Sequence, residues 1–544
     1  MPLVQLAPFK APRRAAASSV AQPYVVPAPT GGLNWRDPIS AMSPADALVL
    51  TNFIPKQQGV ELRRGYQAYS DAVTVGGVAQ SVESVFGYRA PNPADDKVFM
   101  ATAGNIYDVT SGGTPVVAVT GTGSDADEWW TTQFSTPADT FLLAVSPGAG
   151  YWTYSTTTGW VDQTNNINPS GPGGSSIPLT VRTVAVWKQR VWFTFEEESQ
   201  VLYLDTVNAI TGTATFFPMG STLRNGGYVS ALINWTVDAG FGIDDYLVAV
   251  GTEGDVGVWE GTDPTSASTF GLKGVWYVGP VPKHGTYFTP FGGDVMIVSE
   301  LGLVPMSKLI TGQYSQDVQS GGPASKIQSV FAPLVRRLRD EKFFACFVVP
   351  TSDVLVVKLP ADGGTYRQFA MNVTTGAWCQ FLGMPMRSAS VIGGQLYFGT
   401  IDGLVSKGLF GNLDGVDSVG AGGTYVEGEI QTSFQNYGTP AQLKKFGMAR
   451  PIFIATAAPA VKLVVNTQYQ FNTVGGSPFF FDEDNGIWDA GIWNTSTWVG
   501  QNTYQGWYGT TGLGYYGSLR MKVRGLPATV FTSAHMLTET GGVM

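Results

Sequence analysis

Two histidines, His284 and His535, are the first candidates for acid–base chemistry in this chain. Histidine is the side chain that most often moves protons near neutral pH, but each of these residues is isolated in the sequence, with no serine or cysteine nucleophile motif beside it. Intact GxSxG, P-loop and HExxH signatures are absent, as is a GxGxxG motif directly after an expected strand. The sequence therefore indicates no reaction, and we expect that the protein is not an enzyme.

Carboxylates and thiols offer further chemistry. Glycoside hydrolysis needs a pair of carboxylates, but no pair can be matched across distant segments, and the Asp-box motif S-x-D-x-G-x-x-W is absent. Acidic turns at residues 125–128 and 482–486 could offer oxygen ligands to Ca²⁺, yet neither matches a complete calcium loop, so we interpret both as solvated turns. Cys346 and Cys379 belong to no CxxC or Cys/His ligand set and are expected to be free, buried thiols. No metal or other cofactor is expected.

The composition favours a subunit of an assembly. Charged residues make up only 13% of the 544 residues, whereas Gly (68), Phe (30), Tyr (22) and Trp (15) are plentiful, which favours strands, tight turns and large contact surfaces. The formal net charge of −9 opposes a grip on nucleic-acid phosphates, which needs clustered Lys and Arg. No signal peptide and no apolar run of bilayer-spanning length is visible, so we expect folding in a cytoplasm.

A strand–turn–strand unit recurs from residue 81 to residue 410. Any functional site in this region must be held in place by these units. Successive units lie 42 to 59 residues apart, close to the ~40–50 residues of a four-stranded propeller blade. We therefore predict an all-β fold with a β-propeller of six or seven blades, and a stack of unrelated β-sandwiches remains the alternative. The apolar runs that we interpret as the first strands of the units begin at Val98, Phe141, Val191, Tyr246, Val295, Val354 and Leu396.

The N-terminal residues differ in composition from the repeat. Residues 1–31, rich in Ala, Pro and Ser, are predicted to form an extended N-terminal arm. Residues 32–80 are predicted to be a docking segment with one short helix. Ser43 and Pro44 suit the N-cap and the first position of that helix, which would cover residues 45–50.

The rest of the chain divides into two predicted domains. Residues 81–410 form the β-propeller, and residues 411–544 form an additional C-terminal β-rich domain. Within the propeller, apolar side chains recur every three or four residues between residues 325 and 340, with three arginines on the other side. This pattern predicts an amphipathic helix that packs on the core and presents a solvated basic face.

Residues 32–66 carry a further pattern of polar, glycine and proline positions. The residues in question are Gly32, Leu33, Asn34, Arg36, Asp37, Pro38, Met42, Asp46, Ala47, Leu50, Asn52, Phe53, Pro55, Gly59, Val60, Leu62, Arg63, Arg64, Gly65 and Tyr66. This segment resembles the N-terminal segment of the tail nozzle, or tail hub, proteins of short-tailed bacteriophages. Weaker points of similarity are residues 372–378, Phe434, 436–438, 443–446, Arg450, Pro451, Trp488, Asp489, Glu539, Gly541 and Gly542.

The resemblance implies a virion structural protein of the tail, assembled in the host cytoplasm. It implies a homohexameric ring below the portal and adaptor rings, with a propeller-like body in each subunit and a channel through which genomic DNA is ejected. The implied partners are other copies of the chain and the phage adaptor protein, with tail fibres or spikes as further candidates. DNA would pass through the channel without specific binding, in keeping with the acidic composition.

Two groups of residues are candidate interaction sites. The first group is a candidate interface to the adaptor or to another subunit, although its members could equally shape turns and caps. The second group recurs at five-residue spacing and could present an aromatic surface to a glycan or receptor. A receptor- or glycan-binding tail module therefore remains an alternative function. So does a polysaccharide depolymerase, which would need carboxylates that converge at a propeller mouth. The first group is Asn34, Asp37, Asn52, Pro55, Arg63 and Arg64, and the second is Trp488, Trp493 and Trp498.

Overall fold

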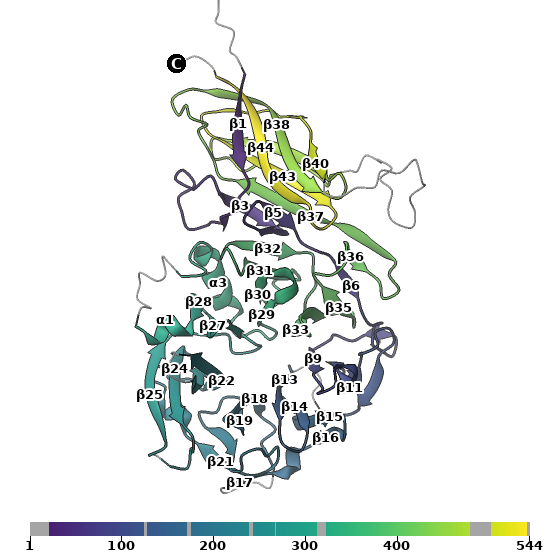
Figure 1. The fold of residues 1–544 in the computed structure, drawn as a ribbon, viewed down its shortest axis with the longest axis vertical. Coiled ribbons are helices and arrows are strands. Elements are labelled where there is room, and N and C mark those ends of the chain that lie inside the picture. The colour runs from purple at the N-terminus through teal and green to yellow at the C-terminus, as the bar shows by residue number, and fades with distance from the viewer. Residues whose placement is uncertain are drawn as a thin grey trace, which may run out of the picture.

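The chain folds into two β-rich bodies. In the computed structural model, strands account for most of the regular structure, and they form a ring of sheets and a second β domain that stands on the rim of the ring. Figure 1 views the ring along its axis. The predicted all-β fold is confirmed. The structure describes residues 21–123, 128–170, 176–238, 243–266, 268–312, 322–478 and 502–540.

Five blades of the ring are separate sheets in which consecutive strands pair antiparallel. Tight hairpins connect them: Ala103 and Gly104, with φ of 51° and 67°, form the turn of the second hairpin of the first blade, a conformation that suits the twist of paired strands. The first blade comprises β9 (Ser84–Tyr88), β10 (Lys97–Thr102), β11 (Asn105–Asp108) and β12 (Val116–Val119), and the second comprises β13 (Trp130–Ser135), β14 (Thr140–Ser146), β15 (Gly150–Ser155) and β16 (Gly159–Asp162). The third comprises β18 (Val181–Trp187), β19 (Arg190–Phe195), β20 (Val201–Leu204) and β21 (Gly212–Phe217), with β17 (Ile167–Ser170) at the outer edge. The fourth comprises β22 (Val229–Asp238), β23 (Ile243–Gly251), β24 (Asp255–Gly261) and β25 (Phe270–Tyr277), and the fifth comprises β26 (Phe288–Phe291), β27 (Asp294–Ser299) and β28 (Gly302–Pro305).

Two further meanders complete the ring in the described part of the chain, which gives seven blades in all. The outer strand of the last blade comes from the N-terminal part of the sequence, since β6 (Tyr66–Ala68) pairs antiparallel with β35. The innermost strand of that blade, β33, contacts β9 of the first blade. The predicted propeller is confirmed, and the stack of sandwiches is excluded. The two meanders are β29 (Ala345–Val349), β30 (Val354–Lys358), β31 (Arg367–Asn372) and β32 (Trp378–Leu382), and β33 (Ser388–Ile392), β34 (Gln395–Gly399) and β35 (Val405–Gly408).

The predicted starts of the repeating units are wrong by one strand. Each of the seven apolar runs is the second strand of its blade, as Val98 in β10 and Phe141 in β14 illustrate. A second strand has a partner strand at each edge and a neighbouring blade on each face, so nearly all of its side chains are apolar and buried. The innermost strands line the axis of the ring, and some of them, such as β13 and β33, are less buried than the second strands. In β13, for example, only Phe134 is buried.

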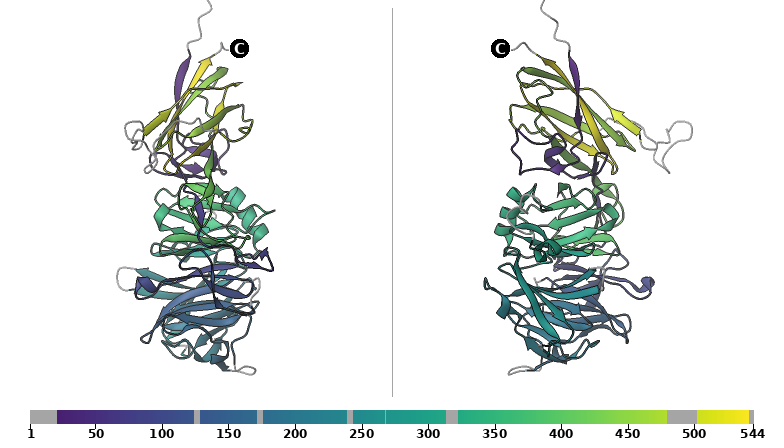
Figure 2. Two further views of the ribbon diagram at one scale, coloured as in Figure 1. Left: turned by 90° about the vertical axis from the view of Figure 1, so that its right-hand side faces the viewer. Right: turned by 60° about the vertical axis from the view of Figure 1, so that its left-hand side comes forward.

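The second body contains the C-terminal strands. In one layer β37 pairs with β43, and β43 pairs with β39; in the other, β38 lies between β44 and β40. Phe446, Leu519 and Phe531, all with 0% exposure, belong to the core between these layers. Figure 2 shows this body extending from the ring. Its strands are β36 (Leu413–Val416), β37 (Gly422–Thr432), β38 (Lys444–Ala455), β39 (Ala460–Thr467), β40 (Asn502–Gln505), β41 (Tyr508–Gly509), β42 (Leu513–Gly514), β43 (Gly517–Gly525) and β44 (Val530–Thr540).

The N-terminal strands join the two bodies. β1 pairs with β44 and β3 pairs with β37 in the C-terminal domain, whereas β6 belongs to the propeller. The part of the predicted arm that the structure describes therefore contains a strand of the subunit itself. Residues 1–20 lie outside the described residues. The N-terminal strands are β1 (Gln22–Pro27), β2 (Gly32–Leu33), β3 (Asp46–Thr51), β4 (Phe53–Pro55), β5 (Val60–Leu62), β7 (Thr74–Val75) and β8 (Val78–Ala79).

The predicted short helix over residues 45–50 is wrong. Ser43 accepts a hydrogen bond from the Ala45 N–H at 3.3 Å, but this contact closes a turn and the chain then enters β3. Ala47 and Leu50 are completely buried there, and β3 gains backbone partners in β37. Pairing and burial outweigh the weak preference of six residues for a helix.

The predicted amphipathic helix is confirmed as α3. Its buried side chains include Phe331 and Val335, which pack on the propeller core. Each arginine of the outer face meets an acidic group: Arg336 contacts Glu300 at 2.7 Å, and Arg337 and Arg339 pair with Asp362 and Glu253. None of the described helices has the length and apolarity that a bilayer crossing requires. The helices are α1 (Met306–Ile310), α3 (Gln328–Leu338) and short 3₁₀ turns at Pro93–Asp95, Thr164–Asn166, Met219–Thr222 and Pro350–Ser352.

Candidate functional site

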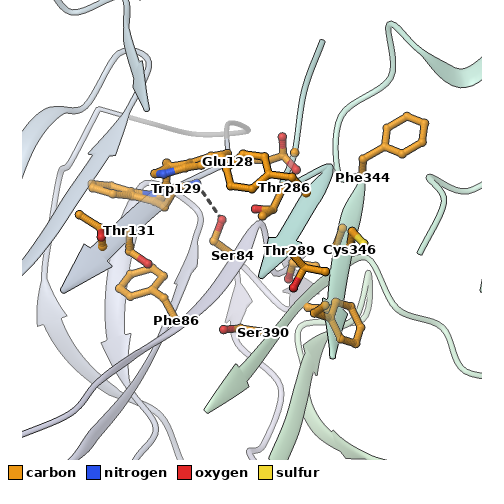
Figure 3. Close-up of a pocket in the computed structure, with 18 of the residues that line it drawn as sticks. Ser84, Phe86, Glu128, Trp129, Thr131, Thr286, Thr289, Phe344, Cys346 and Ser390 are labelled. Atoms are coloured by element: carbon orange, nitrogen blue, oxygen red, sulfur yellow. Dashed lines mark hydrogen bonds between the residues drawn. The ribbon is translucent and has the colours of Figure 1, made fainter. Parts of the chain in front are cut away.

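A cavity of about 600 Å³ lies on the axis of the ring. The innermost strand of every blade contributes to its wall, so residues from β9, β13, β18, β22, β26, β29 and β33 face one another across it. In the part shown in Figure 3, Trp129 and Thr131 lie on one side, and Thr289 and Cys346 on the other. We call this space the mouth cavity.

Polar and charged residues gather at one end of the mouth cavity for a topological reason. Glu83 and Arg387 immediately precede the innermost strands β9 and β33. Glu128 lies two residues before β13, and His284 lies four residues before β26. Innermost strands of a propeller run in the same direction, so the residues before them meet at one end of the ring. Arg182, the second residue of β18, joins this group.

The first charged pair of the mouth links the first and last blades. Arg387 donates to the carboxylate of Glu83 through both Nη2, at 2.8 Å, and Nε, at 3.1 Å. The guanidinium also lies over the ring of Phe343, 4.1 Å from its centroid. A buried carboxylate with two charge-assisted hydrogen bonds is fixed in position. This pair therefore ties β9 to β33 where the ring closes.

The second group of charges is Glu128 with Arg182 and Lys358. The Lys358 side chain is completely buried, and its ammonium donates to the backbone carbonyl oxygens of Phe343 and Arg387. Burial lowers the pKa of Lys358, an effect that Glu128 opposes and Arg387 reinforces. Burial likewise raises the pKa of Glu128, against the positive charges of Arg182 and Lys358. Glu128 lines the mouth cavity and is partly exposed, and the protein packed around it supplies the desolvation.

Aromatic side chains form the apolar part of the wall. Trp130 is partly exposed, and its indole Nε1 donates to the carbonyl oxygen of Val184 at 3.1 Å, which fixes the orientation of the ring. Its ring lies 5.7 Å from that of Phe288. Trp129 is largely buried, and its backbone N–H donates to the hydroxyl of Ser84 at 2.8 Å, as the dashed line in Figure 3 shows.

The thiols and acidic side chains of the described residues form no candidate metal site. Cys346 and Cys379 are buried in the structure, as predicted, and burial raises the pKa of both thiols. Within the described ranges, no group of three or more His, Cys, Asp or Glu residues is placed to hold a metal ion. Of the two acidic turns, residues 125–127 and 482–486 lie outside the described residues.

Asn34 and Asp37, two of the predicted interface residues, are engaged within the subunit. The Asn34 amide donates to Asp37 and to Asp46, each at 2.7 Å, and Asp46 in turn pairs with Lys326 at 2.7 Å. Hydrogen bonds from Arg36 and Asn34 lower the pKa of Asp37. Asn34 is completely buried, whereas Asp37 is partly exposed. Asn34 thus joins the N-terminal segment to the residues before α3.

Asn52 and Arg63 form the joint between the two bodies. All five N–H groups of the Arg63 guanidinium have acceptors: two donate to Asp414 at 2.7 and 2.8 Å, one to Asn52 Oδ1 at 2.9 Å, and two to the carbonyl oxygens of Arg64 and Leu382 at 2.9 Å. The side-chain amide of Asn52 donates to the carbonyl oxygen of Glu427. This joint connects β32 of the propeller with β36 and β37 of the C-terminal domain.

The other predicted site residues are dispersed. Pro55 is buried in β4, and Arg64 is exposed beside the joint. Trp488, Trp493 and Trp498 lie outside the described residues. Asn34, Asn52, Pro55 and Arg63 therefore serve the packing of the subunit itself, and of the six predicted interface residues only Asp37 and Arg64 reach its surface.

Sequence reasoning did not find the mouth cavity. Its charged residues come from different blades, and no short motif unites them. The charged residues share one property that the sequence could reveal, which is their position at or just before the innermost strand of a blade. This property becomes visible only when each strand is assigned to its correct place in the blade.

Comparison with known proteins gives similarities only at the level of solved structures. No protein-family model and no curated protein matches the chain. A crystal structure of BBS1N in complex with ARL6DN, soaked with mercury, has a TM-score of 0.36 and 11% sequence identity, and the match covers 65% of this chain and 98% of that chain. The crystal structure of the Mitotic Checkpoint Complex has a TM-score of 0.36 and 10% identity, with coverage of 65% and 93%. Similarity at this level carries no argument about this chain.

Proposed function

We propose that the protein is a structural subunit of a bacteriophage tail, which forms with other copies of itself a ring-shaped nozzle below the portal and adaptor. Genomic DNA would leave the capsid through the channel of this ring. The resemblance of residues 32–66 to tail nozzle proteins motivates the proposal. An exposed apolar surface on the flank of the subunit is the structural observation that carries it.

The apolar surface, which we call the flank patch, is built from three segments. Hairpin β7–β8, edge strand β12 and the loop before β37 each contribute valines that are 50% to 86% exposed. Exposed apolar side chains that gather in one part of a soluble protein often mark a contact with another protein. The members of the flank patch are Val75, Val78, Val116, Val117 and Val419.

Polar contacts hold the three segments of the flank patch together. The Asp71 carboxylate accepts hydrogen bonds from Ser418 at 2.7 Å and from Thr114 at 2.9 Å. The backbone N–H of Val73, just before β7, donates to the carbonyl oxygen of Gly403 at 3.1 Å, which ties this hairpin to the last blade. These contacts bring the three segments into one part of the folded subunit. An apolar surface of this kind suits a second copy of the chain, since the low charge of the protein provides few ionic contacts.

The rigid connection between the two bodies also supports a structural role. One hydrogen-bonded sheet runs from the propeller meanders through β3 and β37 into the C-terminal domain. A subunit whose domains share a sheet and a fully bonded arginine resists rotation at the joint. Such rigidity suits a conduit that must remain in place while DNA passes. The net charge of −9 would limit adhesion of the DNA.

Introducing charge into the flank patch tests the proposal. The double variant Val75→Asp/Val78→Asp should weaken association between subunits by about 2–4 kcal/mol, which is roughly 30- to 1,000-fold, because two carboxylates would be buried in an apolar contact. Incorporation of the variant into particles, measured by quantitative mass spectrometry, should fall accordingly. Val207→Asp, at a valine that is 49% exposed in the third blade, is the control. Equal incorporation of the two variants would contradict the proposed contact.

The position of the subunit in the particle is the decisive observation. A cryo-EM reconstruction of the portal vertex should show a six-fold ring of this chain, with a channel wider than duplex DNA. Residues of the flank patch should lie between neighbouring subunits. Location of the chain in peripheral fibres or spikes would refute the nozzle and favour a receptor-binding module.

A further inference from the structure

We propose that the mouth cavity of the propeller binds an uncharged saccharide. This site is distinct from the flank patch and from the joint between the bodies, and the nozzle function does not require it. Its volume, wall chemistry and charge balance each point to this class of ligand.

The size and position of the mouth cavity are those of a ligand site. A volume of about 600 Å³ lies within the range of roughly 300–1,000 Å³ that is usual for small-molecule pockets. The wall consists of strands from all seven blades, so it is preformed and rigid.

Hydroxyl and amide groups cover much of the wall. They come from separate blades and can each donate and accept hydrogen bonds, as the hydroxyl groups of a sugar also do. In Figure 3 Thr131 lies on one side of the cavity, and Thr286 and Thr289 lie on the other. A polyhydroxylated ligand can satisfy such a wall at several points, whereas an apolar ligand would leave these groups without partners. The groups in question belong to Ser84, Thr131, Asn234, Thr286, Thr289 and Ser390.

The charges of the wall are balanced. Arg387 pairs with Glu83 at 2.8 Å and Arg182 pairs with Glu196 at 2.9 Å, which leaves Glu128 and Lys358 to offset each other among the charged lining residues. A charged ligand would bring an additional buried charge without a free counter-charge, which is costly. The balance therefore favours a neutral ligand, whose hydroxyl groups can still form strong hydrogen bonds to the charged side chains.

Trp130 offers the apolar surface that a sugar ring needs. Its indole is partly exposed at the cavity, is fixed by the hydrogen bond to Val184 and is supported by Phe288. Sugars present one face of C–H groups, and a rigid aromatic ring can cover that face while the polar edge meets the hydroxyl groups of the wall. Trp130 therefore suits the apolar face of a sugar ring, and the hydroxyl residues suit its hydroxyl groups.

Binding of defined oligosaccharides to the full-length protein tests the inference. The probes are maltohexaose, cellohexaose, mannohexaose and chitohexaose, with hexagalacturonate as the acidic comparison, and binding is measured by calorimetry and by saturation-transfer NMR. At least one neutral probe should bind. Trp130→Ala should weaken this binding roughly tenfold or more. Trp507→Ala, at a tryptophan 43% exposed on the C-terminal domain, should leave it unchanged.

A second variant separates loss of the site from loss of the fold. Ser390→Leu adds bulk to the cavity wall without removing a core side chain, and it should also abolish binding while the far-UV spectrum stays that of the wild type. Binding of no neutral probe, binding of hexagalacturonate alone, or binding that survives both Trp130→Ala and Ser390→Leu would overturn the inference. Release of reducing ends that Glu128→Gln abolishes would support the site and add hydrolysis to binding. None of these outcomes bears on the nozzle, which the particle reconstruction tests separately.

Discussion

Replacing Arg63 with methionine should lower the free energy of unfolding by about 3–5 kcal/mol, the cost of removing one partner of a buried ion pair. Methionine retains much of the aliphatic volume but none of the five N–H donors. The variant would leave the Asp414 carboxylate without its cation, and the carbonyl oxygens of Arg64 and Leu382 without donors. Asn52 Oδ1 would keep only the backbone N–H of Leu382.

Denaturant unfolding of the full-length protein measures this effect, with Arg64→Met as the matched control. Arg64 is the next residue in the sequence and carries the same charge, but its side chain is exposed. We expect the control to unfold within about 0.5 kcal/mol of the wild type. Equal midpoints for the two variants would show that Arg63 does not stabilise the joint. Because the joint connects β32 with β36 and β37, loss of Arg63 should also expose the boundary between the bodies to proteolysis before the core of either body unfolds.

The propeller could be predicted from the sequence because one strand in each blade is strongly apolar. Strands such as β14 and β30 are buried almost throughout, so their spacing along the chain reveals the repeat. The order of strands within each blade could not be predicted in the same way. The innermost strands β13 and β33 border a polar cavity and are mostly partly exposed, and their sequences do not stand out from those of turns.

Contacts between distant residues could not be predicted at all. Arg63 and Asp414 are 351 residues apart, and no local pattern marks them as partners. The same limitation explains the error at residues 45–50, where Ser43 and Pro44 give a correct local signal for a turn. The decision between helix and strand depends on β37, which lies almost 400 residues further along the chain. Six residues with a weak local preference take the structure that their distant partner imposes.

Several of the residues on which the resemblance to nozzle proteins rests stabilise the fold of the subunit itself. Asn34, Asn52 and Arg63 are buried and bonded within the chain, so their side chains position β3, β32 and β36 relative to one another. Residues that fix the angle between two bodies determine the shape that a ring can adopt. In the proposed ring their contribution to assembly would therefore be indirect, and the flank patch, which the sequence did not reveal, would offer the direct contact.

Replacing Lys358 with methionine should have a comparably large effect, a loss of about 3–5 kcal/mol near neutral pH. The variant leaves the desolvated Glu128 without the ammonium that opposes its raised pKa, and it leaves the carbonyl oxygens of Phe343 and Arg387 without a donor. Lys308→Met, at an exposed lysine of α1, is the control and should be nearly neutral. A Lys358→Met protein as stable as this control would refute the structural role of the pair.

The double variant Lys358→Met/Glu128→Gln separates the charge effect from the lost hydrogen bonds. Glutamine removes a carboxylate that has lost one of its positive neighbours, so the double variant should recover part of the loss, and the remainder, about 1–3 kcal/mol, reflects the unpaired carbonyl oxygens. The recovery should depend on pH with a defined sign. The pKa of Glu128 is raised in the folded state, so stability is highest below its unfolded pKa and is lost as the pH rises through the folded pKa. The two variants should therefore be equally stable in acid and diverge as the pH rises, and a pH-independent difference would show that Glu128 does not carry the buried charge.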